Sequence, residues 1–462
     1  MVVQINDRLQ AHLPSLRDMR NGKTLLIWRE LGQWLVLDEE AALLLSRFDQ
    51  ERSVDDVLRE HSRAANKPFD LVVGEALPFL DALSKRRIVG SPPPQPSPPT
   101  DLIRLSNLTF NITNRCNLQC SWCYNPQSSG SEIAIPALMH WLRTGADYLD
   151  RHAAFIILGG EPFLDQPRLL ECIGGAREYF AEEILISTNG TLLNRETPPA
   201  LLKANATVQV SLDSASPAKH DAIRGNGIFH RAVASAQTLA DCGVKTILSM
   251  VMTRHSELEL EPYLDLAIKL GVHEVRFIPL RRIGRGVQGS DESPDLYACF
   301  RRLVEIIQRR PELSRLLHRD FFSILMTACR FSRLRGNCGI GRRCLFVNAD
   351  GSIFPCPNHR ADEFRCGHVV DTPVAGILES SAVLESIRSE YRLEKMRTCF
   401  KCPFCYWCAG DCRAEVLALT GEPDGPSPYC QALQRVMKDL LWLIAEDWRG
   451  LARQDQDINP WS

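Results

Sequence analysis

Three cysteines stand close together in the stretch Cys116-Asn117-Leu118-Gln119-Cys120-Ser121-Trp122-Cys123. Thiolates at such short spacing favour zinc or an iron–sulfur cluster as their metal. Four thiolates complete the ligand set of a four-iron cluster, so a set of three leaves one iron open to bind and activate a further molecule. A zinc site, or three unrelated thiols, is the alternative that this spacing leaves open. We call Cys116, Cys120 and Cys123 the cysteine triad.

A second array of cysteines lies between residues 338 and 430 and contains the spacing C-x-x-C-x-x-x-x-x-C-x-x-x-C. Its members are Cys338, Cys344, Cys356, Cys399, Cys402, Cys408, Cys412 and Cys430. Paired C-x-x-C spacing also suits tetrahedral zinc, so two structural zinc sites are an alternative to iron–sulfur clusters. With 17 cysteines in the chain, we expect metal binding in a reducing compartment rather than a set of disulfides.

Composition narrows the function classes. A chain of 462 residues predicts about three domains, and its net charge of −2 argues against a nucleic-acid partner held by general electrostatics. The 45% hydrophobic and 24% charged content is ordinary for a globular protein. No run approaches the roughly 18 apolar residues that a membrane span needs, and Met1–Asp7 lacks the plan of a signal peptide. We therefore expect a cytoplasmic protein.

The elements around the cysteine triad alternate strand and helix from residue 104 to residue 285. Six such units predict a parallel sheet with crossover helices, and chemistry in such sheets gathers at the carboxyl ends of the strands. The expected strands are Leu108–Thr113, Ala154–Leu158, Ile184–Ser187, Thr207–Leu212, Thr246–Val251 and Glu274–Ile278.

A short motif follows each of several expected strands. The triad follows the first strand, and the glycine turn Gly159-Gly160-Glu161-Pro162 follows the second, where glycine permits close backbone approach. Ser187-Thr188-Asn189-Gly190 follows the third strand, Ser211-Leu212-Asp213 ends the fourth, and Val251 ends the fifth.

The triad, the glycine turn and the serine strand end occur in an order and spacing that resemble the radical S-adenosylmethionine (SAM) enzymes. This resemblance implies a partial (β/α)6 TIM-type barrel with a 4Fe–4S cluster on the triad. It further implies that the open iron chelates the amino and carboxylate groups of SAM, and that one electron cleaves SAM to a 5′-deoxyadenosyl radical.

The same resemblance implies which residues contact SAM. Trp122 occupies the aromatic position whose backbone meets the adenine, and Ser187 and Ser211 are candidates for the ribose or the carboxylate. Arg224 matches an arginine that binds the SAM carboxylate, a task that suits its fork of donors, although a surface salt bridge is an alternative. The implied SAM contacts are Trp122, Gly159, Gly160, Glu161, Ser187, Asn189, Ser211, Asp213, Arg224 and Val251.

The C-terminal array resembles the twitch and SPASM extension of radical SAM peptide maturases. That resemblance implies two auxiliary 4Fe–4S clusters with interlaced ligands. Cys338, Cys344, Cys356 and Cys412 would bind one, and we call them the first cysteine group; Cys399, Cys402, Cys408 and Cys430 would bind the other, and we call them the second cysteine group. Six cysteines remain, by default small hydrophobic residues: Cys172, Cys242, Cys299, Cys329, Cys366 and Cys405. Cys405 lies within the ligand motif and is an alternative ligand, and a hydrogen-donating cysteine could be any of the six.

Residues 1–90 are expected to form a separate unit with a hairpin from Lys23–Trp28 and Gln33–Leu37, followed by three helices. This pattern resembles the winged-helix-like precursor-recognition domain of ribosomal-peptide modifying enzymes, which is similar to the pyrroloquinoline-quinone peptide chaperone. There the leader peptide adds as a strand to the edge of the small sheet. A DNA-binding domain or a structural cap is the alternative, and a balance of 13 basic against 14 acidic residues disfavours DNA.

The expected organisation is completed by three further segments. A proline-rich linker at 91–103 separates the units, a helical bridge spans 286–335, and the twitch/SPASM domain with a terminal helix at Gln431–Trp448 spans 336–462, ending in a loose tail from Leu451. The basic residues Arg281, Arg282 and Arg285 are interpreted as a solvated loop, with an acidic peptide as the alternative partner. His220, His230, His359 and His368 lack metal spacing and are expected to be structural.

Together these features predict a radical SAM enzyme that modifies a ribosomally synthesised precursor peptide and leads to an oxidative cross-link, carbon–carbon or thioether. The implied electron donor is a flavodoxin or ferredoxin. In related sulfatase maturases an aspartate base follows the third cysteine of the array, and Pro357 stands there in this chain, which argues against that activity. Alternatives are a peptide epimerase, a small-molecule enzyme such as a haem-type decarboxylase, and a non-catalytic zinc scaffold. No catalytic acid or base is identifiable.

Overall fold

The structure is a computed structural model that describes residues 2–90, 103–125, 130–194, 196–288, 292–331 and 334–451. The proline-rich linker and the tail expected from the sequence lie almost wholly outside these residues. The strands are β1 (Arg8–Gln10), β2 (Leu16–Arg20), β3 (Lys23–Trp28), β4 (Gln33–Asp38), β5 (Asp49–Ser53), β6 (Leu105–Asn111), β7 (Leu149–Leu158), β8 (Glu183–Thr188), β9 (Thr207–Ser211), β10 (Thr246–Met252), β11 (Glu274–Pro279), β12 (Cys344–Val347), β13 (Ser352–Phe354) and β14 (Gly367–His368).

The α-helices are α1 (Glu39–Leu45), α2 (Val54–Ala65), α3 (Phe69–Lys85), α4 (Ile135–Arg143), α5 (Gln166–Ala176), α6 (Thr197–Lys203), α7 (Pro217–Arg224), α8 (Ile228–Asp241), α9 (Leu260–Lys269), α10 (Leu296–Arg309), α11 (Phe321–Arg330), α12 (Val374–Ser380), α13 (Ala382–Glu390), α14 (Cys405–Cys408), α15 (Arg413–Thr420) and α16 (Cys430–Ala445). The short 3-10 turns that matter below are η1 (Arg29–Leu31) and η5 (Gly284–Gln288).

The N-terminal unit contains the hairpin and the three helices that the sequence indicates, and three further strands: β2, which joins the hairpin, and β1 and β5, which pair with each other. In the three-stranded antiparallel sheet, β3 lies between β2 and β4, and the pair Lys23↔Asp38 sets the β3–β4 register. The start of α2 follows its sequence signal, because Ser53 and Asp56 form a reciprocal capping box. The strands β1, β2 and β5 are too short and too polar to give a clear periodicity, which is why the sequence did not indicate them.

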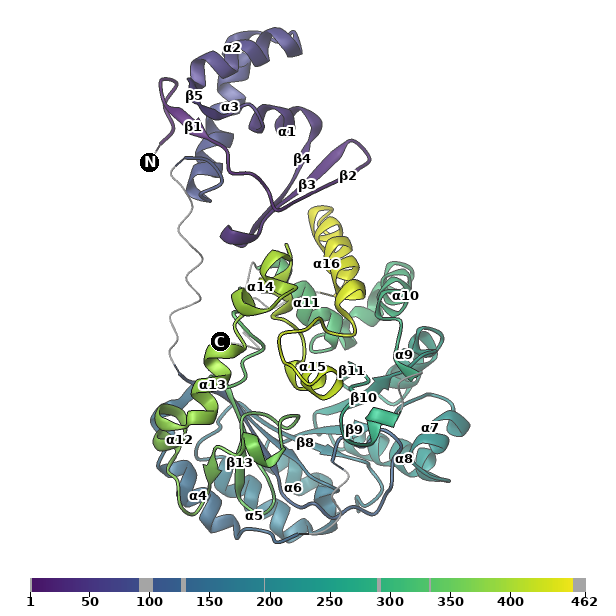
Figure 1. The fold of residues 1–462 in the computed structure, drawn as a ribbon. Helices are drawn as coiled ribbons and strands as arrows, with labels where there is room; N and C mark the ends of the chain where they lie inside the picture. Colours follow the sequence, from purple (N-terminus) through teal and green to yellow (C-terminus); the bar gives the residue numbers. More distant parts are fainter. Residues whose placement is uncertain are drawn as a thin grey trace.

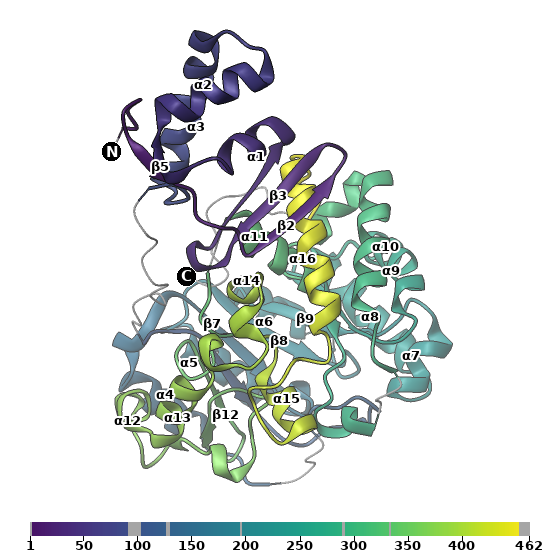
Figure 2. The same ribbon diagram turned by 45° about the horizontal axis from the view of Figure 1, so that its top comes forward.

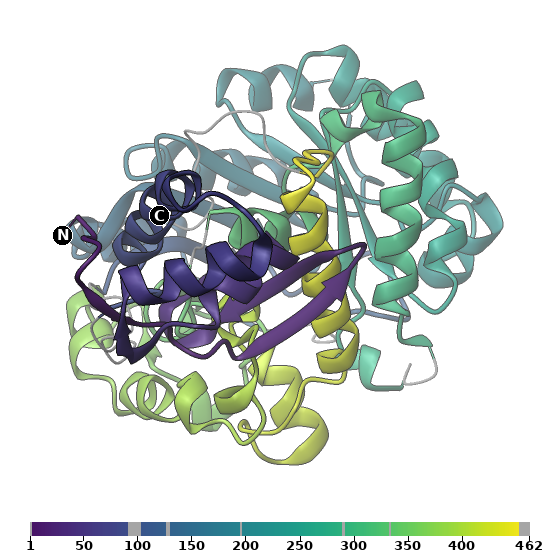
Figure 3. The same cartoon turned by 90° about the horizontal axis from the view of Figure 1, so that it is seen from above.

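The three-stranded sheet is covered on both faces. Leu26 and Trp28 of β3 pack into a core with α1, α2 and α3, whereas Leu25 and Ile27 on the opposite face join the main core of the protein. The alternation of strand side chains between faces places α16 under this second face. Figures 2 and 3 show α16 running beneath β2 and β3.

Parallel strands form the central sheet, whose order is β11-β10-β9-β8-β7-β6-β12-β13-β14. β6 to β11 pair in parallel in chain order with helices between them, which confirms the predicted α/β fold with its largely parallel sheet (Figure 1). The sequence did not predict that β12, which begins at Cys344, extends this sheet parallel to β6. β13 and β14 continue it as antiparallel strands.

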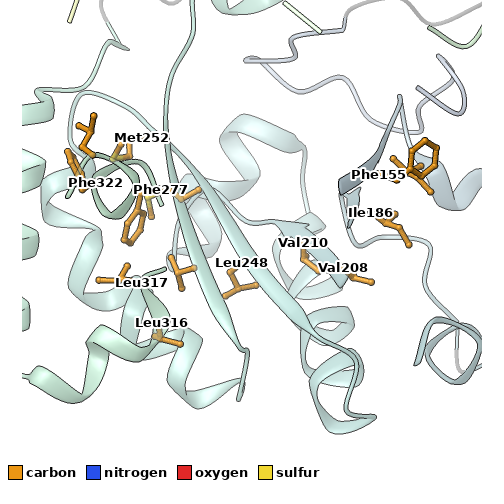
Figure 4. Packing of buried hydrophobic residues seen from close by; sticks show 14 of the residues in the cluster. Phe155, Ile186, Val208, Val210, Leu248, Met252, Phe277, Leu316, Leu317 and Phe322 are labelled. Atoms are coloured by element: carbon orange, nitrogen blue, oxygen red, sulfur yellow. The ribbon is translucent and has the colours of Figure 1, made fainter. Parts of the chain in front are cut away.

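Alternate residues of the parallel strands bury one face of the sheet against the helices. Val208, Val210 and Leu248 are fully buried there, and Figure 4 shows them between neighbouring strands and the covering helices. Burying a side chain of this size contributes about 1.5–3 kcal/mol relative to exposure. The intervening residues, among them Ser187 and Ser211, face the other side, so polar groups line the concave side of the sheet at the ends of the strands.

The terminal helix α16 contacts α10, α11 and strand β4. The sequence interpretation placed it on the SPASM region, whereas its most extensive contacts are with α10 and α11, and its polar stripe pairs with the N-terminal sheet. Asp18 of β2 accepts hydrogen bonds from Lys438 Nζ at 3.0 Å and Trp442 Nε1 at 2.9 Å, while Arg20 pairs with Asp439 at 2.6 Å. Among the described residues, every helix is too short or too polar to cross a membrane.

Candidate active site

The cysteine triad lies in the loop that leaves the carboxyl end of β6. Two main-chain hydrogen bonds fasten the start of this loop to the glycine turn after β7: Gly160 N–H donates to Thr113 O at 2.7 Å, and Glu161 N–H donates to Arg115 O at 2.9 Å. Cys116 is exposed, whereas Cys120 and Cys123 are partly buried. The strand ends thus present three thiols at the concave side of the sheet.

The two glycines allow the turn and the loop to lie in backbone contact. A Cβ atom on Gly159 would lie 2.6 Å from Thr113 O, and one on Gly160 would lie 2.0 Å from Arg115 O. Both obstacles are main-chain atoms, which side-chain rotation cannot move. Any residue other than glycine would therefore push the triad loop away from β7.

Glu161 organises the turn with its side chain. Its carboxylate is completely buried and accepts hydrogen bonds from Thr188 Oγ1 at 2.6 Å, Asn189 N–H at 2.8 Å and Phe163 N–H at 3.1 Å. Burial raises the pKa of Glu161, and the donors oppose this shift. The side chain therefore joins the ends of β7 and β8 and is saturated by protein donors.

Asn189 extends this connection to the triad loop. Its Nδ2 donates to Asn117 Oδ1 at 2.9 Å, and Asn117 Nδ2 in turn donates to Thr191 Oγ1 at 2.8 Å. Thr191 Oγ1 closes the triangle by donating to Asn189 Oδ1 at 2.6 Å. Asn117, directly after the first triad cysteine, was not singled out from the sequence; its place between two metal-spaced cysteines was the available signal.

Asp213 and Arg224 form a buried ion pair beside the triad. Arg224 Nε donates to Asp213 Oδ2 at 2.6 Å, and its NH1 group lies 3.9 Å from Cys120 Sγ. Asp213 Oδ1 also accepts the N–H of Val251 at 3.1 Å. Although burial lowers the pKa of Arg224, the Asp213 and Cys120 charges more than compensate and raise it, so the cation persists. The surface salt bridge weighed for Arg224 is wrong: the pair is buried and touches the triad.

The three triad thiols lie within electrostatic reach of one another. Although Cys116 is exposed as a whole residue, partial desolvation of its thiol raises its pKa, and the charges of Glu161 and of the other two triad thiolates raise it further. Burial also raises the pKa of Cys120, while Arg224 lowers it. A metal that replaces these protons removes the penalty, because thiolates rather than thiols are metal ligands. The donor set and its spacing fit an iron–sulfur cluster bound by three thiolates.

Two arginines from distant segments close the triad loop. Arg285 in η5 donates through Nε to Cys120 O at 2.8 Å, and its N–H donates to Cys123 O at 2.9 Å. Arg360 donates to Tyr124 O at 2.6 Å and to Asn125 Oδ1 at 2.8 Å. The solvated-loop interpretation of Arg285 was therefore wrong, since sequence position gives no sign of a partner 165 residues away.

Arg281 was also misinterpreted as a solvated loop residue. Its guanidinium forms a two-pronged pair with Asp411, at 3.0 and 2.7 Å, and a further pair with Glu415 at 2.8 Å. Glu415 also accepts the N–H of Arg282 at 2.9 Å. Burial opposes the charge of Arg281, but Asp411 raises its pKa well above the usual value. The pair joins the end of β11 to the C-terminal cysteine array.

The structure brings the first cysteine group into one neighbourhood. Burial raises the pKa of Cys338, and the nearby Cys412 thiolate raises it further; Cys338 in turn raises the pKa of Cys344. Burial and the charges of the three other members raise the pKa of Cys356. Asn358 Nδ2 donates to Cys412 Sγ at 3.6 Å. These are the four cysteines that the twitch resemblance groups together.

The second cysteine group forms a separate neighbourhood. Burial raises the pKa of Cys399, with Cys430 adding to it, and burial with Cys430 and Cys399 raises that of Cys402 to about 11. Burial raises the pKa of Cys408 as well, and Cys399 and Cys402 contribute. Gln434 Nε2 donates to Cys430 Sγ at 3.5 Å. Two sets of four thiols suit two clusters with four thiolates each.

Within the described residues, no three Cys, His, Asp or Glu side chains converge closely enough to hold a single metal ion. Cys405 is buried beside the second group, and burial followed by the Cys402 charge raises its pKa to about 12. Cys172, Cys299 and Cys329 are fully buried in the main core, as expected for small hydrophobic residues, and Cys366 packs against it. Cys242 is exposed at the end of α8, so this expectation is wrong for Cys242. His359 bonds Tyr391, and His368 bonds a main-chain carbonyl, in the structural roles expected.

The remaining predicted SAM contacts lie at the same edge of the sheet with fewer interactions. Ser187 Oγ accepts a hydrogen bond from Gln209 Nε2 at 3.4 Å, and Ser211 lies opposite Ser249 in the parallel register. Trp122 Nε1 is buried without a hydrogen-bond partner among the described residues. Ser187 and Ser211 lie at the carboxyl ends of β8 and β9, and Trp122 lies in the triad loop. Their contacts with SAM stay predictions.

Comparison with known proteins gives the same assignment independently. Residues 110–267 match the radical SAM superfamily, and residues 338–403 match SPASM, an iron–sulfur cluster-binding domain. The mycofactocin maturase MftC of Mycobacterium tuberculosis strain CDC 1551 is 31% identical over 335 residues, covering 70% of this chain and 82% of the relative. The PqqA peptide cyclase of Gluconobacter oxydans is 27% identical, covering 72% of this chain and 91% of the relative.

Among solved structures, Streptococcus suis SuiB bound to precursor peptide SuiA is similar, with a TM-score of 0.57 and 16% identity. The match covers 92% of this chain and 99% of SuiB, which has also been solved with S-adenosylmethionine. The parallel sheet, the cysteine triad and the cysteine-rich C-terminal region together define an iron–sulfur enzyme built on a parallel α/β core. The chain belongs to the radical SAM superfamily, within its SPASM-containing peptide-maturase branch, and its chemistry uses SAM and iron–sulfur clusters.

Proposed function

We propose that this protein uses three 4Fe–4S clusters and SAM to modify a ribosomally synthesised precursor peptide, and that the product is an oxidative carbon–carbon or thioether cross-link. The observation that best supports this proposal is the arrangement of the thiols: one set of three lies at the strand ends, and two sets of four lie in the C-terminal region. The similarity to the mycofactocin maturase MftC and to the PqqA peptide cyclase supports a peptide substrate.

When bound, the cluster and SAM supply a 5′-deoxyadenosyl radical that takes a hydrogen atom from a peptide carbon. The residues of this chain hold the reactants in place. Cys116, Cys120 and Cys123 would bind the cluster, and the Gly159–Gly160 turn fixes their loop. Arg224 keeps a positive charge against Cys120. Because the cofactors carry the chemistry, positioning is the main task of the protein.

The N-terminal unit, residues 1–90, is proposed to bind the leader of the precursor. Its sheet has β2 and β4 as edge strands in the described residues, and an edge strand can accept a peptide as an added strand. The fold likeness to SuiB supports this unit, since 92% coverage leaves about 37 of the 462 residues unmatched, fewer than the unit contains. A flavodoxin or ferredoxin donor and a cytoplasmic location stay predictions.

The test of the proposed activity is mass spectrometry of a candidate precursor co-expressed with the protein. Loss of a hydrogen pair from the peptide is expected, and it should be absent with Cys116, Cys120 and Cys123 replaced by alanine. An unchanged mass with inverted amino-acid chirality would show that the protein epimerises the peptide and does not cross-link it. Unchanged mass and chirality across the candidate precursors would contradict peptide modification and favour a small-molecule substrate.

Leader recognition is tested separately by fluorescence anisotropy with a labelled leader peptide. Full-length protein should bind it, and protein lacking residues 1–90 should not, while a peptide of the same composition in scrambled order serves as the control. Equal binding and turnover without residues 1–90 would contradict the role proposed for the N-terminal unit.

A further inference from the structure

The segment between Cys408 and Cys412 connects the two cysteine groups, because Cys408 belongs to the second and Cys412 to the first. Three successive residues of this segment have positive φ: Ala409 at 58°, Gly410 at 76° and Asp411 at 56°. A left-handed conformation costs a residue with a side chain roughly 1–2 kcal/mol. We call Ala409–Asp411 the left-handed bridge, and its strain requires compensation from its surroundings.

Two arginines and a serine hold the left-handed bridge. Arg281 binds the carboxylate of Asp411 with two hydrogen bonds, and Ser427 Oγ donates to the same carboxylate at 2.5 Å. Arg413 donates to the carbonyl of Gly410 from the other side. The bridge is therefore clamped from the barrel by Arg281 and from α15 by Arg413.

Arg413 differs from Arg281 in its charge balance. It is 1% exposed, and among the described residues every hydrogen bond from its guanidinium goes to a main-chain carbonyl: Gly410 O, Pro423 O at 3.0 Å and Gly425 O at 2.7 Å. In the described part of the chain, no carboxylate forms a contact ion pair with it. The charge of Arg413 helps to lower the pKa of Asp411 against burial, but the Asp411 carboxylate is bound by Arg281 and Ser427. A buried cation without a bound anion is costly, so an anion close by would stabilise it.

Anionic groups lie on both sides of Arg413. The residue directly follows Cys412 of the first cysteine group, and the positive charge of its guanidinium lowers the pKa of Cys338 in that group against the larger opposite effect of burial. Its hydrogen bond to Gly410 O reaches the main chain two residues after Cys408 of the second group. Its charge also lowers the pKa of Cys399 in that group, against the larger effect of burial. The guanidinium is thus a buried cation common to both groups, as is that of Arg335, which acts on Cys338 and Cys408. Clusters with four thiolates would give each group a net negative charge.

We propose that Arg413 is a positioning residue common to the two auxiliary clusters, which locks the left-handed bridge between them and makes both easier to reduce through its positive charge. This inference rests on the cluster assignment in the proposed function. Net charge and hydrogen bonding near a cluster set its reduction potential, and a fixed cation favours the more negative reduced state. Electron transfer through the array would then respond to the charge at Arg413.

The test is a redox titration followed by electron paramagnetic resonance. It uses the full chain with the cysteine triad replaced by alanine, so that only the auxiliary clusters contribute. Arg413→Met should lower the reduced-to-oxidised ratio of both clusters at a fixed potential by about tenfold, which is about 59 mV for a one-electron couple. Arg413→Lys keeps the charge and should stay within about threefold of the parent protein.

Arg177→Met is the matched control. Within the part of the chain that the structure describes, Arg177 also donates only to main-chain carbonyls, those of Phe180, Ala181, Ala204 and Asn205, but it lies at the end of α5 in the barrel. Its replacement should leave both potentials unchanged. Iron content is measured first for every variant, so that a lost cluster is not mistaken for a shifted potential.

Arg413→Met with full iron and unchanged potentials would overturn the inference, as would Arg413→Lys with full iron and a shift as large as that of the methionine variant. If the methionine variant fails to hold iron, the lysine variant with full iron is used instead: a reduced-to-oxidised ratio within about threefold of the parent protein supports the inference, and a larger change overturns it. Auxiliary iron absent from the parent protein would instead contradict the cluster assignment. The peptide plays no part in this readout, so a wrong substrate would leave the result intact.

Discussion

Replacing Gly160 by alanine tests how the triad loop is held. The added Cβ would lie 2.0 Å from Arg115 O, 2.4 Å from Arg115 C and 2.8 Å from Asn114 O, all main-chain atoms. Reaching ordinary contact requires a displacement of about 1 Å, which breaks the hydrogen bonds from Gly160 N–H and Glu161 N–H. Each lost bond costs about 0.5–1.5 kcal/mol and overpacking about 1–3 kcal/mol, so we expect a destabilisation of about 4 kcal/mol.

The assay has two readouts under oxygen-free conditions: urea unfolding followed by circular dichroism, and 5′-deoxyadenosine formed from SAM with a chemical reductant. Because a misplacement of about 1 Å reduces catalysis about 100-fold, deoxyadenosine formation should fall to that extent. Gly174→Ala in α5 is the matched control, since no atom lies within 4 Å of its added Cβ, and it should gain about 0.5–1 kcal/mol. Parent-like unfolding and SAM cleavage in Gly160→Ala would refute the reasoning.

Four further predictions concern other contacts described above. Glu161→Gln leaves one of three buried donors without an acceptor and should cost about 1–3 kcal/mol in urea unfolding, whereas an unchanged midpoint would contradict its organising role. Burial, followed by the Arg224 charge, lowers the pKa of His220 from 6.5 to about 4, so the unfolded chain takes up this proton first and stability should fall by up to about 3 kcal/mol as pH drops from 6.5 to 4. His220→Asn should flatten that slope in unfolding measured against pH, and an identical slope would assign the effect elsewhere. Arg281→Met leaves Asp411 and Glu415 buried and unpaired and should cost about 3–5 kcal/mol, compared with no measurable change for the exposed Arg301→Met. Asp18→Asn weakens the contacts with Lys438 and Trp442, so amide hydrogen exchange in α16 should accelerate; equal exchange would show that the N-terminal sheet does not stabilise this helix.

The strand ends were predictable from the sequence because alternating strand and helix patterns report burial directly. The glycine turn, the triad and the Ser211–Asp213 segment therefore fell at one edge of the sheet as expected. The strand boundaries differ from the prediction by a few residues. The first strand was expected to end at Thr113, but β6 ends at Asn111, and the carbonyl of Thr113 accepts the hydrogen bond from Gly160 N–H. A pattern of burial does not contain that detail.

Partners distant in sequence were the part that the sequence could not supply. Arg360 reaches Tyr124 across 236 residues, and Arg281 reaches Asp411 across 130. A basic residue after a strand has the same local appearance whether it is solvated or buried, because its partner is chosen by tertiary packing. The same limit concealed β12, where Cys344 pairs beside Asn107 and connects the first cysteine group to the barrel sheet.

The central claim is that the cysteine triad generates a radical that takes hydrogen from a peptide. The most direct measurement is deuterium transfer: a precursor peptide with fully deuterated residues is incubated with reduced protein and SAM, and the 5′-deoxyadenosine is analysed by mass spectrometry. We predict deoxyadenosine that carries deuterium from the peptide, and none with the triad replaced by alanine. Deoxyadenosine that forms without deuterium from any residue of the peptide would contradict the account.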